Sequence, residues 1–286
     1  MGYEINKVEF DGFDAVELKT KVWKAILVYS VGPRIAWFGK PDGENLLYWK
    51  KDDMIRGDWK LYGGHRVWIT RPLADESEDT YLSDNAPCEL IIDGTMVRAT
   101  APAHPVNQLT KGMELEIMEG GSLRVTNFIK NDGALIYSGG VWSPTCVVPD
   151  ARKLRVPLGK DDSTWDVVKV IIPRVFAGNV SSLEDDQAVF EGNDLVVTPK
   201  GRVLKRVLLA PKGRVMLECG DYVFEKYSPY NPLYAYPFGG CNLAVFVGAN
   251  NFMAELETYG AETEIIPGQT IENTEYWKLY ESAAGK

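Results

Sequence analysis

Near its end the chain reads Phe252-Met253-Ala254-Glu255-Leu256-Glu257-Thr258. This strand-like run places two carboxylates two residues apart. Because side chains alternate between the two faces of a strand, Glu255 and Glu257 share one face and can point together at one small target. Pro267-Gly268 then predicts a turn, and Tyr276-Trp277-Lys278-Leu279 predicts a closing strand of aromatic and aliphatic residues.

Strand signals recur along the whole chain, whereas helix signals are almost absent. Residues 22–29 are β-branched and aromatic, and a similar run at 33–39 follows the Gly32-Pro33 break. Further pairs of β-rich runs flank turn-forming residues, and each pair predicts a hairpin. These pairs are 115–118 with 123–129, 188–190 with 195–197, and 204–209 with 214–219. The polar residues 159–164 predict either a loop or the start of a short helix at Ser163.

The resulting meander of short strands predicts an all-β protein. It is punctuated by 27 glycines and 16 prolines, as expected for an antiparallel sandwich or barrel. Neither a low-complexity linker nor a repeat interrupts it. The chain of 286 residues is long enough to bury a sizeable core. We expect one domain that spans residues 1–286 rather than two.

The composition excludes several kinds of partner. The net charge of -9 and the pI of about 5.0 argue against nucleic acid and against an anionic membrane surface. No apolar run approaches the ~18 residues of a membrane span, and residues 1–7 lack signal-peptide character. The four cysteines are widely spaced, at Cys88, Cys146, Cys219 and Cys241. We expect free thiols and a cytoplasmic protein.

The order of these motifs resembles that of the galactose mutarotase-like (aldose 1-epimerase-like) superfamily. The resemblance runs from residues 27–39 and Asn45-Leu46-Leu47, through residues 112–133, to Leu256-Glu257-Thr258 and Pro267-Gly268. It implies the large antiparallel β-sandwich of that superfamily, called a supersandwich, and a sugar substrate. It also implies that Glu257, in the Leu-Glu-Thr position, is the catalytic base. Gly63-Gly64-His65-Arg66 is similar to the signature of a branch of this superfamily whose function is unknown.

Histidines are scarce, since the chain contains only His65 and His104. The glycines before His65 allow close approach of backbone or ligand and a positive φ angle. His65 therefore suits a polar pocket, where it would act as general acid. The alternative is a turn histidine that is hydrogen-bonded to the backbone. His104, between two prolines, is expected to lie in a constrained loop without a catalytic role.

Mutarotation of an aldose needs a base for the anomeric hydroxyl proton and an acid for the ring oxygen. Glutamate and histidine suit these roles because a desolvated pocket can shift their pKa values towards neutrality. Glu257 and His65 are therefore the expected catalytic residues. Characterised mutarotases carry their acid histidine in the stretch that matches residues 135–144, and this chain has no histidine there. The sequence therefore leaves two alternatives, namely catalysis on a sugar and sugar binding without catalysis.

Sugar recognition needs aromatic faces and polar groups for the hydroxyls. We expect substrate-binding roles for Arg66, Trp68, Trp142, Lys205, Lys226 and Glu255. The cations would favour a uronate or a sugar phosphate, whereas isolated lysines are more often solvated. For Glu255 the alternative is a pair with a cross-strand cation. The aromatic segment 227–237 is expected either to rim the site or to fold over the core.

No cofactor and no metal are expected. The chain lacks the glycine-rich nucleotide motifs and any cluster of cysteine and histidine. The expected function is binding of a small-molecule carbohydrate, with mutarotase or epimerase activity as its enzymatic form. The alternative is a non-catalytic binding or regulatory module on the same fold. The sequence leaves open the sugar, its anomer and the oligomeric state, including a homodimer.

Overall fold

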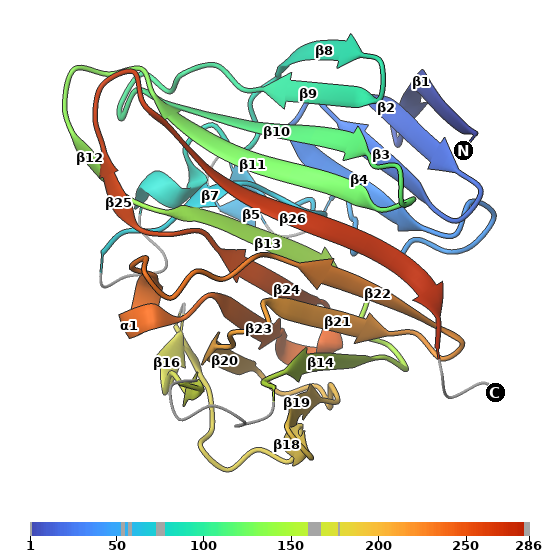
Figure 1. Ribbon diagram of the computed structural model, residues 1–286, viewed down its shortest axis with the longest axis vertical. Helices are drawn as coiled ribbons and strands as arrows, with labels where there is room; N and C mark the ends of the chain where they lie inside the picture. The colour runs from blue at the N-terminus through green and yellow to red at the C-terminus, as the bar shows by residue number, and fades with distance from the viewer. Residues whose placement is uncertain are drawn as a thin grey trace.

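The computed structural model describes residues 2–52, 55–56, 59–72, 78–159, 167–176 and 178–282. Strands dominate these residues, and their only helices are three short ones: α1 (Pro237–Gly240) and the 3₁₀ turns η1 (Glu78–Tyr81) and η2 (Ala249–Asn251). The predicted all-β fold with large antiparallel sheets is confirmed (Figure 1). Most of the polar stretch 159–164 lies outside the described residues.

The largest sheet has ten antiparallel strands. They are β8 (Glu89–Asp93), β9 (Met96–Thr100), β10 (Leu109–Ile117), β11 (Leu123–Asn131), β14 (Lys153–Pro157), β18 (Ala188–Glu191), β19 (Asp194–Val197), β21 (Arg214–Glu218), β22 (Tyr222–Tyr227) and β26 (Thr270–Glu281). Their order is β18-β19-β14-β21-β22-β26-β11-β10-β9-β8. The long closing strand β26 therefore runs through the middle of the sheet, between β22 and β11 (Figure 1).

The opposite layer consists of a four-stranded and a six-stranded sheet. The first contains β1 (Tyr3–Phe10), β2 (Phe13–Thr20), β3 (Lys24–Val28) and β4 (Arg34–Gly39) in sequence order. The second contains β7 (Trp68–Ile69), β13 (Val141–Val147), β15 (Lys169–Ile171), β20 (Leu204–Leu209), β23 (Leu243–Val247) and β24 (Ala254–Tyr259), in the order β15-β20-β23-β24-β13-β7. His65 joins the two sheets, because it bridges Ile35 of β4 on one side and Thr145 of β13 on the other.

Shorter pairs complete the described strands. They are β5 (Ile55–Arg56) with β6 (Trp59–Lys60), β12 (Tyr137–Gly139) with β25 (Thr263–Ile265), and β16 (Val175–Phe176) with β17 (Asn179–Val180).

The main core lies between the two layers. Phe38 of β4 packs against Phe224 of β22 at 4.8 Å and Trp277 of β26 at 5.1 Å between ring centroids. The closing aromatic strand thus contributes directly to the interface between the sheets.

Two of the three predicted hairpins are confirmed, and one is wrong. β10 pairs with β11, and β18 pairs with β19. By contrast, β20 pairs with β15 and β23, whereas β21 pairs with β14 and β22 in the other layer. The turn at Pro211-Lys212-Gly213 therefore carries the chain between sheets. A Cβ on Gly213 would lie 2.0 Å from the Ser228 carbonyl oxygen, so this crossing requires glycine.

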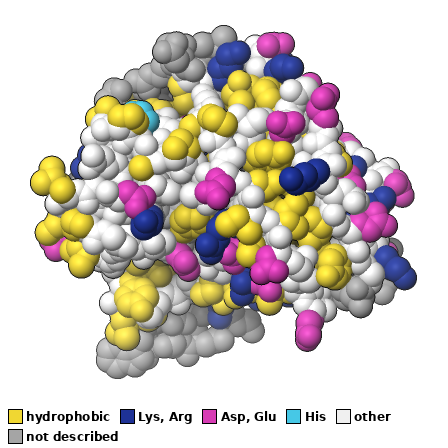
Figure 2. Space-filling view, turned by 90° about the horizontal axis from the view of Figure 1, so that it is seen from above, with side chains coloured by type: hydrophobic (Ala, Val, Ile, Leu, Met, Phe, Trp, Pro, Cys, Tyr) yellow, Lys and Arg dark blue, Asp and Glu magenta, His cyan; other side chains and the backbone are white. Residues whose placement is uncertain are grey.

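Acidic and basic side chains are interspersed on the face of the molecule seen in Figure 2. Ion pairs link neighbouring strands at the surface, such as Arg98 of β9 with Glu114 of β10 (2.6 Å). None of the described helices is long and apolar enough to cross a membrane.

Candidate functional site

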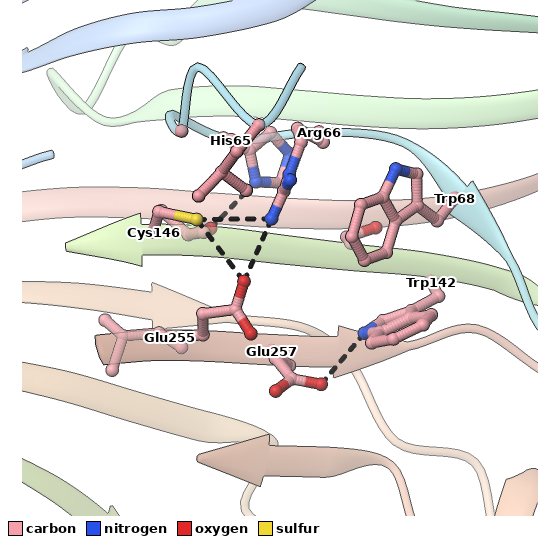
Figure 3. Close-up of polar contacts among 12 residues, drawn as sticks. His65, Arg66, Trp68, Trp142, Cys146, Glu255 and Glu257 are labelled. Carbon is pink, nitrogen blue, oxygen red and sulfur yellow. Dashed lines mark hydrogen bonds and ion pairs between the residues drawn. The ribbon is translucent and has the colours of Figure 1, made fainter. Parts of the chain in front are cut away.

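The strand that carries the two expected carboxylates presents them on one face. Glu255, Glu257 and Tyr259 of β24 point away from the ten-stranded sheet, while Leu256 lies in the core between the layers. Their cross-strand partners on β13 are Cys146, Pro144 and Trp142. Because directly opposed residues share a face, these side chains form a continuous surface on the outer side of the six-stranded sheet. Figure 3 shows this surface from the side.

A cavity of about 380 Å³ opens over this surface. Its size falls within the usual range of about 300–1,000 Å³ for small-molecule sites. The walls are mainly aromatic, and the charged groups at the cavity among the described residues are Arg66 and Glu255. The aromatic lining residues are Trp59, Trp68, Tyr81, Trp142, Phe176, Phe246 and Phe252. Flat apolar faces beside a few polar groups are the arrangement that suits a sugar ring.

A larger cavity of about 700 Å³ lies on the outer face of the ten-stranded sheet. Its floor is apolar at Phe128, whose ring covers Gly112. Two of its basic groups already have acidic partners, because Arg98 pairs with Glu114 and Lys130 pairs with Asp132. The smaller cavity is the better candidate site, since buried polar groups converge there.

Two glycines place Arg66 at the cavity. Gly63 and Gly64 adopt φ angles of 93° and 74°. A Cβ on Gly63 would lie 2.2 Å from the carbonyl oxygen of Tyr48, and one on Gly64 would lie 2.5 Å from that of Ile35. Only glycine fits such close approach at positive φ. The expected positive φ angles and close backbone approach are therefore confirmed at both glycines. This geometry brings His65 and Arg66 between β4 and β13.

Arg66 is fully buried yet incompletely hydrogen-bonded. Its Nη2 donates to Glu255 Oε1 at 2.9 Å and to the Cys146 sulfur at 3.2 Å. Its guanidinium lies over the Trp68 ring, 4.1 Å from the centroid. Nε and Nη1 have no partner among the described residues. Because an unsatisfied buried donor costs about 1–3 kcal/mol, a ligand oxygen that accepted these bonds would be stabilised.

Glu255 is the carboxylate at the cavity (Figure 3). Burial raises its pKa above the ordinary value, and the neighbouring Glu257 raises it further, against the lowering effect of Arg66. The Cys146 thiol donates to Glu255 Oε1 at 3.3 Å. Burial also raises the pKa of Cys146, so the thiol stays protonated and keeps this donor role. The surroundings of Glu255 therefore make it a stronger proton acceptor than a free glutamate.

Glu257 lies beneath the cavity rather than on its wall. It is fully buried, and Lys205 Nζ donates to both of its oxygens, at 2.5 and 2.7 Å. The indole of Trp142 and the hydroxyl of Tyr259 each donate to Oε2 at 2.9 Å. Every hydrogen bond described for this carboxylate thus comes from the protein. Glu257 and Lys205 orient the cavity wall through Trp142.

His65 and Lys226 occupy the opposite face of the sheet. The His65 ring bonds Thr145 Oγ1 at 2.8 Å and Asn127 Oδ1 at 3.0 Å, between the two layers. Burial lowers the pKa of His65 from 6.5 to about 4, so the ring is neutral near pH 7. Lys226 pairs with Glu275 at 3.0 Å in the same interior. Neither side chain lines the cavity.

The structure therefore divides the expected site residues into three groups. Arg66, Trp68, Trp142 and Glu255 line the cavity, Glu257 and Lys205 lie directly beneath it, and His65 and Lys226 lie between the sheets. His104 lies in a surface loop, where its Nδ1 accepts the Val106 amide. The cavity residues that the sequence did not reveal include Trp59, Tyr81 and Phe252, which come from distant segments and share no motif.

Among the described residues, no group of three or more His, Cys, Asp and Glu side chains could hold a metal ion. All four cysteines are free thiols. The stretch 135–144, which lacks a histidine, contributes Trp142 to the cavity instead.

No protein-family model matches the chain, and no curated protein sequence is significantly similar to it. Structures are similar over nearly its whole length. A candidate aldose 1-epimerase from Escherichia coli K12 has a TM-score of 0.65 and 10% identity, covering 98% of this chain and 100% of that one. A candidate mutarotase from Salmonella typhimurium has a TM-score of 0.63 and 12% identity, covering 97% and 94%. A galactose mutarotase-like protein from Clostridium acetobutylicum has a TM-score of 0.63 and 10% identity, covering 98% and 99%.

This is the galactose mutarotase-like fold. The expected resemblance to this superfamily is confirmed at the level of the fold. The aromatic cavity of this chain lies over β13 and β24.

Proposed function

We propose that this chain binds a monosaccharide in the aromatic cavity over β13 and β24. The observation that carries the proposal is Arg66, which is buried at the cavity with two nitrogen atoms that lack partners among the described residues. Sugar hydroxyls would accept from these donors, while the faces of Trp68 and Trp142 would cover the C–H surface. The galactose mutarotase-like fold supports this ligand class.

Charge balance favours an uncharged aldose over the anionic sugars expected from the sequence. Each cation that was expected to attract an anion has its own carboxylate. Arg66 pairs with Glu255 at 2.9 Å, Lys205 with Glu257 at 2.5 Å, and Lys226 with Glu275 at 3.0 Å. An added carboxylate or phosphate would lose its hydration without gaining an unpaired cation. We therefore propose a neutral aldose.

Isothermal titration tests this proposal with neutral aldoses, uronates and sugar phosphates. We expect a neutral aldose to bind, and Arg66→Lys to weaken binding at least tenfold because it removes the planar donor group but keeps the charge. Arg155→Lys, in a surface ion-pair cluster on β14, is the matched control and should bind normally. Binding of none of the sugars, or equal affinity in Arg66→Lys, would contradict the proposed site.

A second candidate function is mutarotation, and the raised pKa of Glu255 favours it. In this form Glu255 would take the anomeric hydroxyl proton as the ring C–O bond opens. Arg66 would stabilise the alkoxide that forms at the ring oxygen by donating hydrogen bonds to it. When this oxygen attacks the carbonyl carbon again, Glu255 would return the proton to the anomeric oxygen. We assign the base role to Glu255 rather than Glu257, because protein donors surround Glu257. We do not assign the acid role to His65.

Polarimetry of freshly dissolved aldose separates catalysis from binding alone. A mutarotase accelerates the spontaneous change in optical rotation, and Glu255→Gln abolishes the acceleration. A binding module leaves the spontaneous rate unaltered even though titration shows affinity.

We extend the proposal to the number of domains and the cellular compartment. The compared structures cover at least 97% of this chain, which supports our proposal that it forms one domain. The free thiols support a reducing compartment, which we propose is the cytoplasm.

A further inference from the structure

A buried carboxylate behind the cavity wall holds two of the wall tryptophans. Asp84 follows the turn η1 and is 5% exposed. Its Oδ1 accepts the indole N–H of Trp68 at 3.0 Å, and its Oδ2 accepts that of Trp59 at 2.6 Å. Both tryptophans line the cavity, whereas Asp84 does not. One aspartate thus fixes two rings that come from separate segments of the chain.

Arg34 of β4 fixes this aspartate in turn. Its Nη2 donates to Asp84 Oδ2 at 2.7 Å and to the Asp84 carbonyl at 3.2 Å. Its Nη1 donates to the carbonyl oxygens of Leu61 and Gly63, at 3.0 and 3.1 Å. Burial alone would raise the pKa of Asp84, but Arg34 and Arg66 lower it below its ordinary value. The carboxylate therefore stays ionised and keeps two acceptor oxygens.

The two indole rings connect Asp84 with Arg66, the basic group at the cavity. Trp59 and Trp68 each pack edge-on against Tyr81, with ring centroids 4.8 and 5.3 Å away, respectively. Trp68 also packs against Trp142 at 4.9 Å and lies beneath the Arg66 guanidinium. An indole has one N–H, so a fixed partner for that group restricts the rotation of the whole ring.

We propose that Asp84 is a positioning residue, which holds Trp59 and Trp68 as a preformed wall of the binding cavity. This inference rests on the proposed function, because the wall matters for binding only if the cavity takes a ligand. A preformed wall strengthens binding because no side-chain freedom is lost when the sugar arrives. Through Trp68, Asp84 also fixes the plane of Arg66.

Asp84→Asn tests the inference because it keeps the size of the side chain. Asparagine has one acceptor oxygen, and its amide group would face a donor, so one indole bond must be lost. Asp11→Asn is the matched control. Asp11 likewise accepts an indole N–H, from Trp49 at 2.9 Å, but this exposed pair lies away from the cavity.

The experiment combines titration with a neutral aldose and ¹⁵N spectra of tryptophan-labelled protein. Asp84→Asn should shift the indole N–H signals of Trp59 and Trp68 and weaken binding about tenfold. Asp11→Asn should shift only Trp49 and leave affinity unchanged. Moved indole signals with full affinity in Asp84→Asn would overturn the inference.

A measurement on the wild-type protein tests the inference even if Asp84→Asn does not fold. Heteronuclear relaxation of the indole N–H groups should show Trp59 and Trp68 already rigid without ligand. Rings that become rigid only after sugar is added would overturn the inference. If no sugar bound to the wild type, the proposed function would fail, and the relaxation data would still show whether Trp59 and Trp68 form a rigid wall without ligand.

Discussion

At the scale of single residues, Glu255 and Glu257 show how environment separates two chemically equal groups. They lie on the same face of β24. Glu257 receives hydrogen bonds from Lys205, Trp142 and Tyr259, so groups of the protein occupy its oxygens. Glu255 borders the cavity, and burial beside Glu257 raises its pKa. The carboxyl group at the cavity thus has a raised pKa.

Under the proposed mutarotase function, the pH dependence of the reaction should report the raised pKa of Glu255. Because the pKa of Glu255 lies above the ordinary 4.5, acidification removes the basic form at a higher pH than for a free glutamate. The rate should therefore fall on acidification with a midpoint above pH 4.5, and Glu255→Gln should lower it at least about 100-fold. Polarimetry across pH measures both effects.

Glu264→Gln is the control for this experiment, because it removes an exposed carboxylate on β25. A rate that does not change between pH 4 and 8, or full activity of Glu255→Gln, would remove Glu255 from the mechanism.

At the scale of strands, the register of the six-stranded sheet builds the support beneath the cavity. Lys205 opposes Phe246, which opposes Glu255, while Ala244 opposes Glu257. The Lys205 ammonium nevertheless bonds Glu257, diagonally across the intervening strand β23. The small side chain of Ala244 leaves room for this contact, so the pair links β20 to β24.

Breaking this pair should destabilise the fold. Lys205→Met leaves the fully buried carboxyl group of Glu257 without its cationic partner, and the expected loss is about 3–5 kcal/mol in the free energy of unfolding. The double variant Lys205→Met with Glu257→Leu should recover most of this loss, because no lone charge remains. Urea unfolding measures both.

Lys200→Met serves as the control, since the Lys200–Asp186 pair is largely exposed and should matter little. Equal instability of the single and double variants would show that the buried pair does not act as a unit.

Sequence patterns predict the strands better than the partners of those strands. Turn residues between β-rich runs identified β10–β11 and β18–β19 correctly. The same signal failed at residues 204–219, because a turn between sheets uses the same glycine and proline chemistry as a hairpin. Spacing alone placed Glu255 and Glu257 on one face. It could not show that His65 and the adjacent Arg66 point to opposite faces, because that depends on which strands they bridge.

At the scale of the whole molecule, a buried polar network joins the two layers. Lys226 of β22 pairs with Glu275 of β26, and it also donates to Thr145 of β13 at 2.6 Å. Burial alone would raise the pKa of Glu275, but Lys226 and His65 lower it below the ordinary value. His65 completes the network from the opposite layer. These groups fix the relative position of the sheets that carry the cavity.

Stability should therefore decrease in mild acid through His65. The folded-state pKa of about 4 lies below the unfolded value of 6.5, so the unfolded chain takes up the proton first. This contribution is present above pH 6.5 and is lost as the pH falls towards 4. Its full size is about 3 kcal/mol.

Urea unfolding between pH 4 and 7 measures this loss. His65→Gln should be less stable at pH 7 and show a flatter pH dependence, while His104→Gln controls for the removal of a histidine. An unchanged slope in His65→Gln would contradict the assignment of the network.

The central claim is that a neutral monosaccharide binds in the cavity over β13 and β24. Titration of ¹⁵N-tryptophan-labelled protein with a neutral aldose tests it most directly. The account predicts that the indole signals of Trp59, Trp68 and Trp142 shift together and saturate, while those of Trp23 and Trp277 in the core stay in place. Saturable binding that leaves these three signals unmoved would place the sugar elsewhere and contradict the account.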